Sequence, residues 1–254
     1  MEPMNILVLG GTTEATALAR LLAERRDVQP TLSLAGRTLK PERSPLPTRI
    51  GGFGGVYGLA TYLRENAVEA VVDATHPFAA QMSGNAVEAC QAAGVPLARL
   101  IRVPWEAETG GRWIAVESLP AAAEALRTLG ERIFLSVGRQ SLKPFEAVPE
   151  KGYLVRTVDP PEPPPDFPRW TLVQDRGPFT LDGELRLLRE HGIEAVVTKN
   201  SGGTATRAKL EAARVLGLPV VVVKRPALPP ADAEFHEAAK VLDWLDGLHS
   251  PPSR

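Results

Sequence analysis

The stretch NILVLGGTTEATALARLL, residues 5–22, decides the fold. It begins with an uninterrupted apolar run, which is typical of a parallel strand buried on both faces. Two glycines follow, and after them comes a helical stripe of apolar residues: Ala15, Leu18, Ala19 and Leu22. A buried strand, a glycine turn and an amphipathic helix predict the first βα unit of a nucleotide-binding sheet, although the usual third glycine of that turn is absent.

Composition excludes several classes of protein. Of the 254 residues, 44% are hydrophobic, which is ample for a core, and 29 basic residues against 30 acidic ones provide no general field to bind nucleic acid. The single cysteine and the four histidines have no disulfide or metal-site spacing, so no metal is expected. There is no signal peptide and no apolar run of about 18 residues, so we expect a cytoplasmic protein that binds no membrane.

Apolar runs that resemble strands alternate with helical patterns along the chain. The expected strands are residues 5–10, 29–34, 70–75, 96–100, 112–116, 132–138, 152–158, 195–199 and 219–225. The expected helices are residues 13–24, 57–66, 77–93, 120–129, 181–191, 204–216 and 233–248. Such an alternation predicts an α/β protein with mainly parallel sheets and right-handed crossovers.

The alternation is interrupted once, at PWEAETGG, residues 104–111, which we interpret as a linker. We therefore expect two Rossmann-like parallel-sheet domains with a cleft between them. Residues 1–103 would bind the dinucleotide, and residues 104–254 would form a second α/β domain that faces the substrate. The C-terminal helix is a candidate to pack across the domain interface.

The first glycine turn is a candidate phosphate site. Backbone N–H groups at a helix start lack intrahelical acceptors, and glycines let a phosphate approach them. Gly10 and Gly11 would do this, and Thr12 and Thr13 would either donate to phosphate or cap the helix. The alternative is a capped βα turn without a ligand.

The end of the second strand favours NADP(H) over NAD. Arg37 lies 26 residues after Gly11, and no acidic residue follows the strand. NAD sites carry an acid there for the ribose diol, whereas a guanidinium can bind the 2′-phosphate of NADP(H). We also expect Gly36, and Gly54 within GGFGG, to let the backbone approach the cofactor. The alternative is a solvated surface arginine.

The motif DATHPFA, residues 73–79, follows another strand. It should place Asp73, Thr75 and His76 at the carboxyl edge of the sheet, beside the glycine turn. There Thr75 and His76 would border the nicotinamide or donate to the substrate. The alternative is a capped helix with a structural histidine and with Pro77 in its first turn.

Cations follow two strands of the second half, in SVGRQ at 136–140 and TKNSGG at 198–203. Ammonium, guanidinium and N–H donors at one sheet edge can bind carboxylates or phosphates. The alternative is a solvated face. The residues expected to face an anionic substrate are Arg139, Lys199, Asn200, Ser201, Gly202 and Arg207.

Three catalytic patterns are missing from the chain. None of the three tyrosines is followed by lysine four residues later, as in short-chain dehydrogenases. There is no Gly-x-Ser-x-Gly elbow and no Gly-x4-Gly-Lys-Ser/Thr loop. The sequence therefore argues against hydrolase and P-loop ATPase activity.

Taken in order, the motifs resemble one known family. The motifs LVLGGTTEA, LAGRT, GGFGG, DATHPFA, SVGRQ and TKNSGG, within about residues 5–225, are similar to those of the precorrin-6A reductases of cobalamin biosynthesis. The resemblance implies an NADPH-dependent oxidoreductase that reduces one carbon–carbon double bond of a ring-contracted, polycarboxylate tetrapyrrole. The substrate would be precorrin-6A or cobalt-precorrin-6A, and the product precorrin-6B.

The resemblance also implies roles for the candidate residues. Gly10, Thr12, Thr13 and Arg37 would hold NADPH, and the cations of the second half would face the carboxylates of the tetrapyrrole. The proton would come from Lys199, from His76 or from water. Other enzymes of the corrin pathway are candidate partners. A non-catalytic NADP-binding redox sensor is the alternative, because no dehydrogenase dyad is present.

Overall fold

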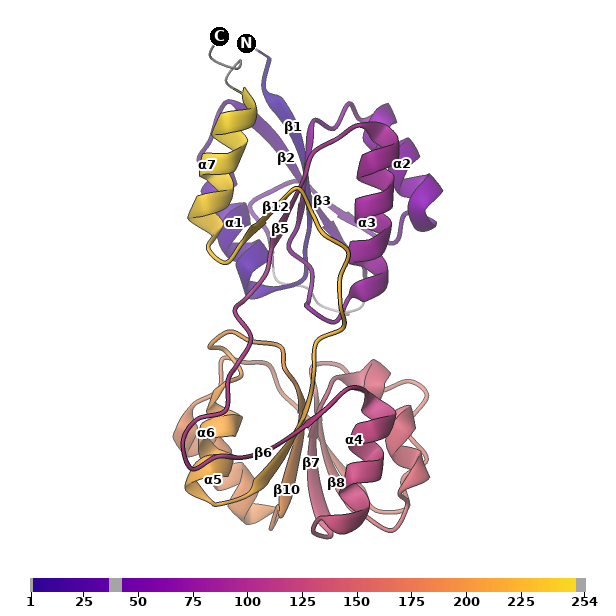
Figure 1. Cartoon of the computed structure of the whole chain (residues 1–254), viewed down its shortest axis with the longest axis vertical. Coiled ribbons are helices and arrows are strands. Elements are labelled where there is room, and N and C mark those ends of the chain that lie inside the picture. Colours follow the sequence, from indigo (N-terminus) through magenta and orange to yellow (C-terminus); the bar gives the residue numbers. More distant parts are fainter. Residues whose placement is uncertain (1, 37–42, 250–254) are drawn as a thin grey trace. The chain divides into compact units, whose positions relative to one another are not determined.

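The computed structural model describes residues 2–36 and 43–249, which fold into two compact units (Figure 1). One unit comprises Met1–Val103 together with Pro226–Arg254, and the other comprises Pro104–Arg225. Within the described residues, no helix is long and apolar enough to cross a lipid bilayer.

The first unit contains one parallel sheet with the strand order β12-β5-β4-β1-β2-β3. Its strands are β1 (Met4–Leu9), β2 (Val28–Leu34), β3 (Thr48–Ile50), β4 (Ala70–Asp73), β5 (Leu97–Leu100) and β12 (Ala233–Phe235). Its helices are α1 (Thr13–Ala23), α2 (Gly55–Glu65), α3 (Ala80–Ala93) and α7 (Ala238–His249).

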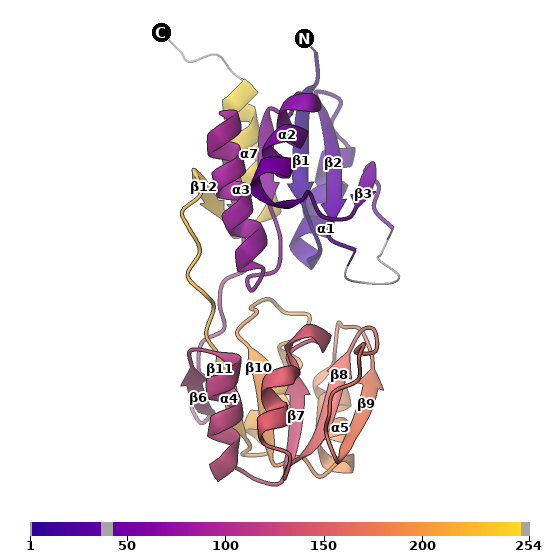
Figure 2. The same ribbon diagram turned by 90° about the vertical axis from the view of Figure 1, so that its right-hand side faces the viewer.

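The apolar run of β1 is buried on both faces of this sheet. Ile6 and Val8 belong to the core under α1 and α7, whereas Leu7 and Leu9 belong to the core under α2 and α3. Figures 1 and 2 show these two helix pairs on opposite faces. The continuous hydrophobic pattern of residues 5–9 therefore follows from burial on both sides.

Strand order reverses direction at β1. The chain leaves β1 for β2 and β3 on one side, and it then places β4 on the other side of β1. In doubly wound sheets, ligands bind at the carboxyl ends of the strands on either side of such a switch point. For this unit, that place is the edge formed by the residues after Leu9 and after Asp73.

The C-terminal segment belongs to the first unit, which corrects the expected domain 104–254. After residue 225 the chain returns, and Ala233–Phe235 pairs in parallel with β5. Helix α7 then packs on α1, with Val241 and Leu245 fully buried in the core on that face. The expected helix 233–248 is accordingly a short strand followed by a helix. The apolar face of α7 is thus covered by the core of the first unit.

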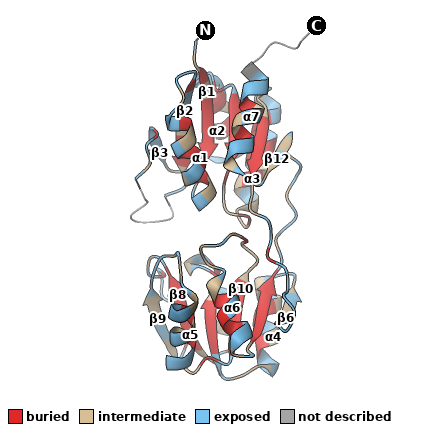
Figure 3. Cartoon of the chain, turned by 90° about the vertical axis from the view of Figure 1, so that its left-hand side faces the viewer, coloured by how far each residue is buried: buried red, intermediate tan, exposed pale blue. Residues whose placement is uncertain are grey.

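The second unit contains another parallel sheet, with the order β6-β11-β10-β7-β8-β9. Its strands are β6 (Arg112–Val116), β7 (Arg132–Ser136), β8 (Gly152–Thr157), β9 (Trp170–Gln174), β10 (Ala195–Lys199) and β11 (Pro219–Val223). Its helices are α4 (Leu119–Ala125), α5 (Leu181–Glu190) and α6 (Ala208–Val215), with 3-10 turns at Leu126–Thr128, Arg139–Ser141 and Lys143–Ala147. The switch point lies between β7 and β10, and the central strands of both sheets are buried (Figure 3).

The structure confirms the α/β class and both Rossmann-like parallel sheets, and, besides α7, it moves two helix starts by three residues or more. Helix α3 begins at Ala80 instead of Pro77, because hydrogen bonds within residues 73–79 hold that segment as a turn. Helix α6 begins at Ala208 instead of Thr204, so Arg207 is its N-cap residue and does not lie one turn inside.

Candidate functional site

In the first glycine turn, Gly10 is closely packed and Gly11 is open to solvent. A Cβ at Gly10 would lie 2.5 Å from Leu32 Cδ1, so a larger residue there would force the buried side chain of Leu32 on β2 to shift. Gly11 has a φ of 118°, and nothing lies within 4 Å of the position that its Cβ would occupy. The backbone of Gly11 is therefore accessible to a ligand, as a phosphate-binding turn requires.

Thr12 caps helix α1 and ties it to the neighbouring strand. Its Oγ1 accepts from the Ala15 N–H at 3.1 Å and donates to the carbonyl oxygen of Ala74 at 2.8 Å. The side chain is 9% exposed. Since its hydroxyl hydrogen is already donated, Thr12 acts as a cap and as a link between the loops after β1 and β4.

Thr13 begins α1 and is exposed, with its Oγ1 donating to Glu14 Oε2 at 3.0 Å. Glu14 in turn accepts from Arg102 Nε at 2.6 Å. The N–H groups of Thr13 and Glu14 have no intrahelical acceptor, because they belong to the first turn. This helix start therefore supplies backbone donors for an anion.

Gly36 follows β2, at the same carboxyl edge of the sheet. Gly36 is exposed at a φ of 73°, and Arg37 lies outside the described residues. Sequence analysis overlooked Arg49 at this place. Its Nη1 donates to Ser33 Oγ at 2.8 Å, and its guanidinium lies 3.8 Å from the ring centroid of Phe53.

Arg49 also organises the GGFGG turn, because its Nη1 donates to the carbonyl oxygen of Gly51 at 3.0 Å. Gly54 has a φ of 81° and is the N-cap residue of α2. The turn therefore owes its shape to a cation on β3 and to a glycine in the left-handed region. A single arginine on a three-residue strand carries no periodic signal, so the sequence could not reveal it.

The DATHPFA motif lies beside the glycine turn, as the Thr12–Ala74 hydrogen bond shows. Asp73 is 2% exposed, and its Oδ1 accepts from the N–H of Thr75 at 3.1 Å and from the hydroxyl of Thr75 at 2.7 Å. His76 Nδ1 accepts from the N–H of Phe78 at 3.2 Å. A neutral His76 consequently carries its proton on Nε2, which is then the donor nitrogen.

At the carboxyl edge of the second sheet, Lys199 and the SVGRQ segment meet. Lys199 Nζ donates to Ser141 Oγ at 2.7 Å, and Ser141 follows Arg139 in the 3-10 turn after β7. Arg139 Nη1 donates to the carbonyl oxygen of Pro160 at 3.2 Å. The structure thus brings two of the predicted cations to the switch point between β7 and β10.

The loop after Lys199 is held by two residues that sequence analysis did not select, Trp105 and Arg225. The Asn200 side chain accepts from the Trp105 N–H at 2.8 Å and donates to the Trp105 carbonyl at 2.9 Å. Trp105 Nε1 donates to the carbonyl oxygen of Gly203 at 2.7 Å. Arg225 donates to the carbonyl oxygens of Asn200 and Ser201 at 2.8 and 3.1 Å. Trp105 was assigned to a linker, so nothing in its neighbourhood pointed to this role.

Arg207 pairs with Glu108, and both side chains are about half exposed. Gly202 is buried at a φ of 69° and Ser201 is half-buried. The predicted substrate residues Ser201, Gly202 and Arg207 therefore lie on one loop. The Arg207 side chain binds Glu108, in the segment that also carries Trp105.

Below this loop lies a buried charged cluster. Lys209 is 3% exposed, and its Nζ lies 5.1 Å from the ring centroid of Trp105. Burial, followed by the charge of Arg156, lowers the pKa of Lys209 to about 7, while Glu184 opposes the shift. Arg156 and Glu184 form a buried ion pair, and the Arg156 guanidinium lies 3.7 Å from the ring centroid of Phe179.

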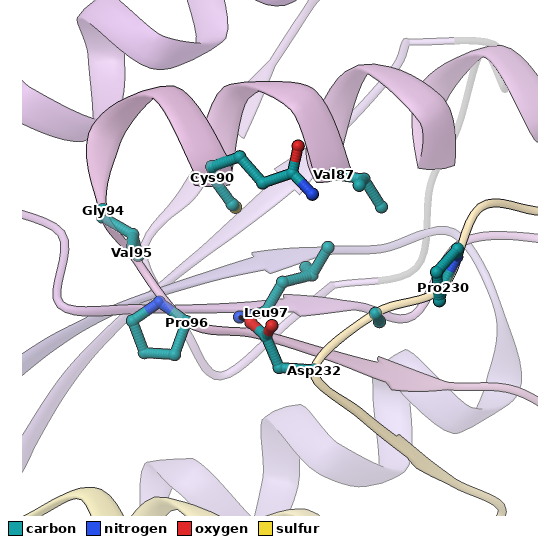
Figure 4. A pocket seen from close by; sticks show the side chains of 10 residues that line it. Val87, Cys90, Gly94, Val95, Pro96, Leu97, Pro230 and Asp232 are labelled. Carbon is teal, nitrogen blue, oxygen red and sulfur yellow. Dashed lines mark hydrogen bonds between the residues drawn. The ribbon is translucent and has the colours of Figure 1, made fainter.

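A cavity of about 340 Å³ lies at the other edge of the first sheet (Figure 4). It is lined by the last turns of α3, the start of β5 and residues 230–232, so it faces away from the carboxyl ends of the strands. Burial raises the pKa of the Cys90 thiol to about 12, which leaves it protonated and unreactive at neutral pH. Within the described residues, no three His, Cys, Asp or Glu side chains gather as metal ligands.

Comparison with known proteins identifies close relatives of the chain. Residues 5–246 match the family model described as Precorrin-6x reductase CbiJ/CobK. The precorrin-6A reductase of Rhodobacter capsulatus is 53% identical over 95% of each chain. The precorrin-6A reductase of Rhodococcus erythropolis is 47% identical over 96% of this chain and 98% of its own. The cobalt-precorrin-6A reductase of Salmonella typhimurium is 30% identical over 96% of this chain and 98% of its own.

A solved structure agrees with these matches. The structure titled CobK precorrin-6A reductase has a TM-score of 0.90 and 50% sequence identity, and the match covers 98% of both chains. The family resemblance inferred from the ordered motifs is therefore confirmed, and so is the α/β fold predicted from the alternation of strands and helices. None of the relatives described above is a non-catalytic redox sensor.

Proposed function

Since the chain belongs to the precorrin-6x reductase CbiJ/CobK family, it is an oxidoreductase of cobalamin biosynthesis, and we propose that it reduces metal-free precorrin-6A with NADPH. The choice of the metal-free substrate rests on the sequence identity of this chain to two groups of relatives. Five relatives named precorrin-6A reductase are 43–53% identical to this chain, whereas three relatives named cobalt-precorrin-6A reductase are 30% identical.

The first unit suits a dinucleotide at its switch point. Gly10 and Gly11, with the N–H groups of Thr13 and Glu14, would bind the pyrophosphate, and Thr12 would hold the turn in shape. Gly36 and Arg37 would bind the 2′-phosphate, with Gly54 shaping the neighbouring turn. When bound, NADPH supplies the hydride, so the residues of the chain need only orient it and exclude water.

The carboxyl edge of the second sheet suits a polycarboxylate substrate. Arg139 lies there in the 3-10 turn after β7, Lys199 donates to Ser141 of the same turn, and Ser201, Gly202 and Arg207 follow Lys199 on the next loop. Charge-assisted hydrogen bonds from ammonium and guanidinium groups are the strongest ones available for carboxylates. Asn200, whose amide is bonded to Trp105, would position this loop.

Reduction of a carbon–carbon double bond needs a proton as well as a hydride. Lys199 is a candidate donor, because its ammonium group carries acidic N–H protons and lies at the carboxyl edge of the second sheet, where Nζ donates to Ser141 Oγ. His76 is the second candidate, because its Nδ1 accepts from Phe78 and leaves the donor proton on Nε2. Water is the third.

The proposal is tested by anaerobic incubation of the purified protein with NADPH and either precorrin-6A or cobalt-precorrin-6A. We expect NADPH oxidation and a product two hydrogens heavier with the metal-free substrate, and slower turnover with the cobalt form. Preference for the cobalt form would overturn the choice of substrate, and turnover of neither would overturn the proposed function.

The proposal also covers the cellular location and the partners of the protein. We propose a cytoplasmic enzyme that acts beside the other enzymes of the corrin pathway. Cell fractionation tests the location, and co-purification with the enzymes that produce precorrin-6A or consume precorrin-6B tests the association. Recovery of the protein in the membrane fraction would contradict the location.

A further inference from the structure

The hydroxyl hydrogen of Thr75 points toward the buried carboxylate of Asp73. Thr75 Oγ1 donates to Asp73 Oδ1 at 2.7 Å, and the same carboxylate oxygen accepts from the N–H of Thr75 at 3.1 Å. A threonine hydroxyl has one hydrogen and two lone pairs. With the hydrogen used, Thr75 Oγ1 offers only lone pairs to a molecule bound at this edge of the sheet.

The second carboxylate oxygen of Asp73, Oδ2, lies beside the guanidinium of Arg99. Asp73 and Arg99 are register partners on β4 and β5, they are 2% and 4% exposed, and Arg99 Nε lies 3.8 Å from Asp73 Oδ2. Arg99 is itself held by the returning C-terminal segment, because its Nη2 donates to the carbonyl oxygen of Pro229 at 2.8 Å. At this distance the contact is an ion pair without a hydrogen bond, and its attraction for Oδ2 leaves Oδ1 directed at Thr75.

Ser83 is the other hydroxyl near Thr75. The two oxygens are 3.5 Å apart, which is long for a hydrogen bond between hydroxyls. Because the Thr75 hydrogen already goes to Asp73, any hydrogen between the two oxygens must come from Ser83. Ser83 can use only one of the two lone pairs of Thr75 Oγ1, and Thr75 is only half-buried, so a second lone pair is left to accept from a ligand.

The position of Thr75 identifies the ligand group that it would bind. The two halves of a doubly wound sheet bind the two mononucleotides, and Thr75 follows β4, on the opposite side of β1 from β2 and β3. Phosphates and carboxylates only accept hydrogen bonds, so they do not suit an acceptor. The nicotinamide carboxamide carries an NH₂ group that donates.

Resting on the proposed function, we infer that Thr75 accepts a hydrogen bond from the carboxamide NH₂ of the nicotinamide, and that Asp73 is the positioning residue that fixes Thr75 as an acceptor. Of the two roles open to Thr75 from the sequence, the hydrogen-bond direction favours the nicotinamide over donation to the substrate. Arg99 links this arrangement to the segment around Pro229.

The test compares the binding of NADP⁺ with that of 3-acetylpyridine adenine dinucleotide phosphate, measured by calorimetry without substrate. The analogue keeps the ring carbonyl and lacks the NH₂ group. For one lost neutral hydrogen bond we expect the wild-type protein to bind NADP⁺ about three- to tenfold more tightly. Thr75→Val should bring this ratio to about one, and Thr75→Ser should keep it.

Asp73→Asn tests the positioning role. The asparagine amide can donate to Thr75 Oγ1 and so release the hydroxyl hydrogen toward the ligand, which should also bring the ratio close to one. Thermal unfolding shows whether this buried variant is folded. Thr171→Val is the matched control, because Thr171 is exposed on β9 of the second unit and should leave the ratio unchanged.

The outcomes separate the inference from the proposed function. A wild-type ratio of one, or a ratio that survives Thr75→Val, overturns the role of Thr75. A ratio that survives in folded Asp73→Asn overturns the role of Asp73. If the wild-type protein binds neither nucleotide, the proposed cofactor is wrong as well.

Discussion

Asn200 pairs its side-chain amide with both backbone groups of Trp105. Its Oδ1 accepts from the Trp105 N–H at 2.8 Å, and its Nδ2 donates to the Trp105 carbonyl at 2.9 Å. The indole of Trp105 adds a hydrogen bond to the carbonyl oxygen of Gly203 at 2.7 Å. A residue 95 positions away in the sequence thus fixes both ends of the loop 200–203.

Trp105→Phe should loosen this loop. The substitution removes the indole N–H and leaves the carbonyl of Gly203 without that donor, which costs about 1–3 kcal/mol. We expect a lower free energy of unfolding in urea and a higher KM for the tetrapyrrole, with the Kd for NADP⁺ unchanged. Trp113→Phe, at a half-buried position on β6, is the matched control. Equal effects of both variants on KM would contradict a specific role of Trp105.

Lys199→Ala should mainly impair the substrate side of the reaction. It removes an ammonium from the carboxyl edge of the second sheet together with its 2.7 Å bond to Ser141. Loss of one charge-assisted contact of about 1.5–3 kcal/mol corresponds to roughly a 10- to 100-fold lower kcat/KM. Ser141→Ala keeps the ammonium and should cost less, and Lys240→Ala, exposed on α7, serves as the control. Unchanged kinetics in Lys199→Ala would remove this residue from the site.

The stability of the protein should rise with pH just above neutrality because of Lys209. Its pKa is about 7 in the folded chain and 10.5 in the reference state. Between these values the unfolded chain binds more protons, so the free energy of unfolding increases with pH, by at most about 1.4 kcal/mol per pH unit. Below pH 7 this dependence disappears, since Lys209 is then protonated in both states.

Urea unfolding of the wild-type protein and of Lys209→Met, at intervals from pH 7 to about 8.5, measures this effect. Methionine keeps the length of the buried side chain without its charge. The difference in slope between the two proteins is the contribution of Lys209. Parallel slopes would show that the Lys209 pKa is not lowered in the folded chain.

The architecture could be predicted because each βα unit carries its own signal. Buried runs such as residues 5–9 and 195–199 identify parallel strands without help from the rest of the chain. Three strands were missed: β3, β9 and β12. The strands β3 and β12 have three residues each and so show no period, and their neighbours in the sheet hold them in place. The return of residues 226–254 to the first unit depends on tertiary contacts of α7, which no local pattern reveals.

Some residues of the candidate site could likewise be predicted from local sequence, and others could not. Glycine turns and strand-end cations, such as Gly11 and Lys199, are visible because their function lies in their own local sequence. Trp105 and Arg99 act on residues far away in the chain, Asn200 and Asp73, and so they carry no motif. The structure also answers a question left open by the motif, because the bonds of Thr12 to Ala74 and Ala15 make it a helix cap.

Arg37→Ala should separate the two nicotinamide dinucleotides. NADPH differs from NADH by the 2′-phosphate, and a guanidinium at the end of the second strand would bind that group through charge-assisted hydrogen bonds. Removing the guanidinium should weaken the binding of NADPH by about 1–3 kcal/mol and the binding of NADH far less. A fluorescence titration measures the Kd of each nucleotide. Arg26→Ala, on the turn that precedes β2 at the opposite edge of the sheet, should change neither Kd. Equal weakening of both nucleotides by Arg37→Ala would mean that this arginine does not recognise the 2′-phosphate.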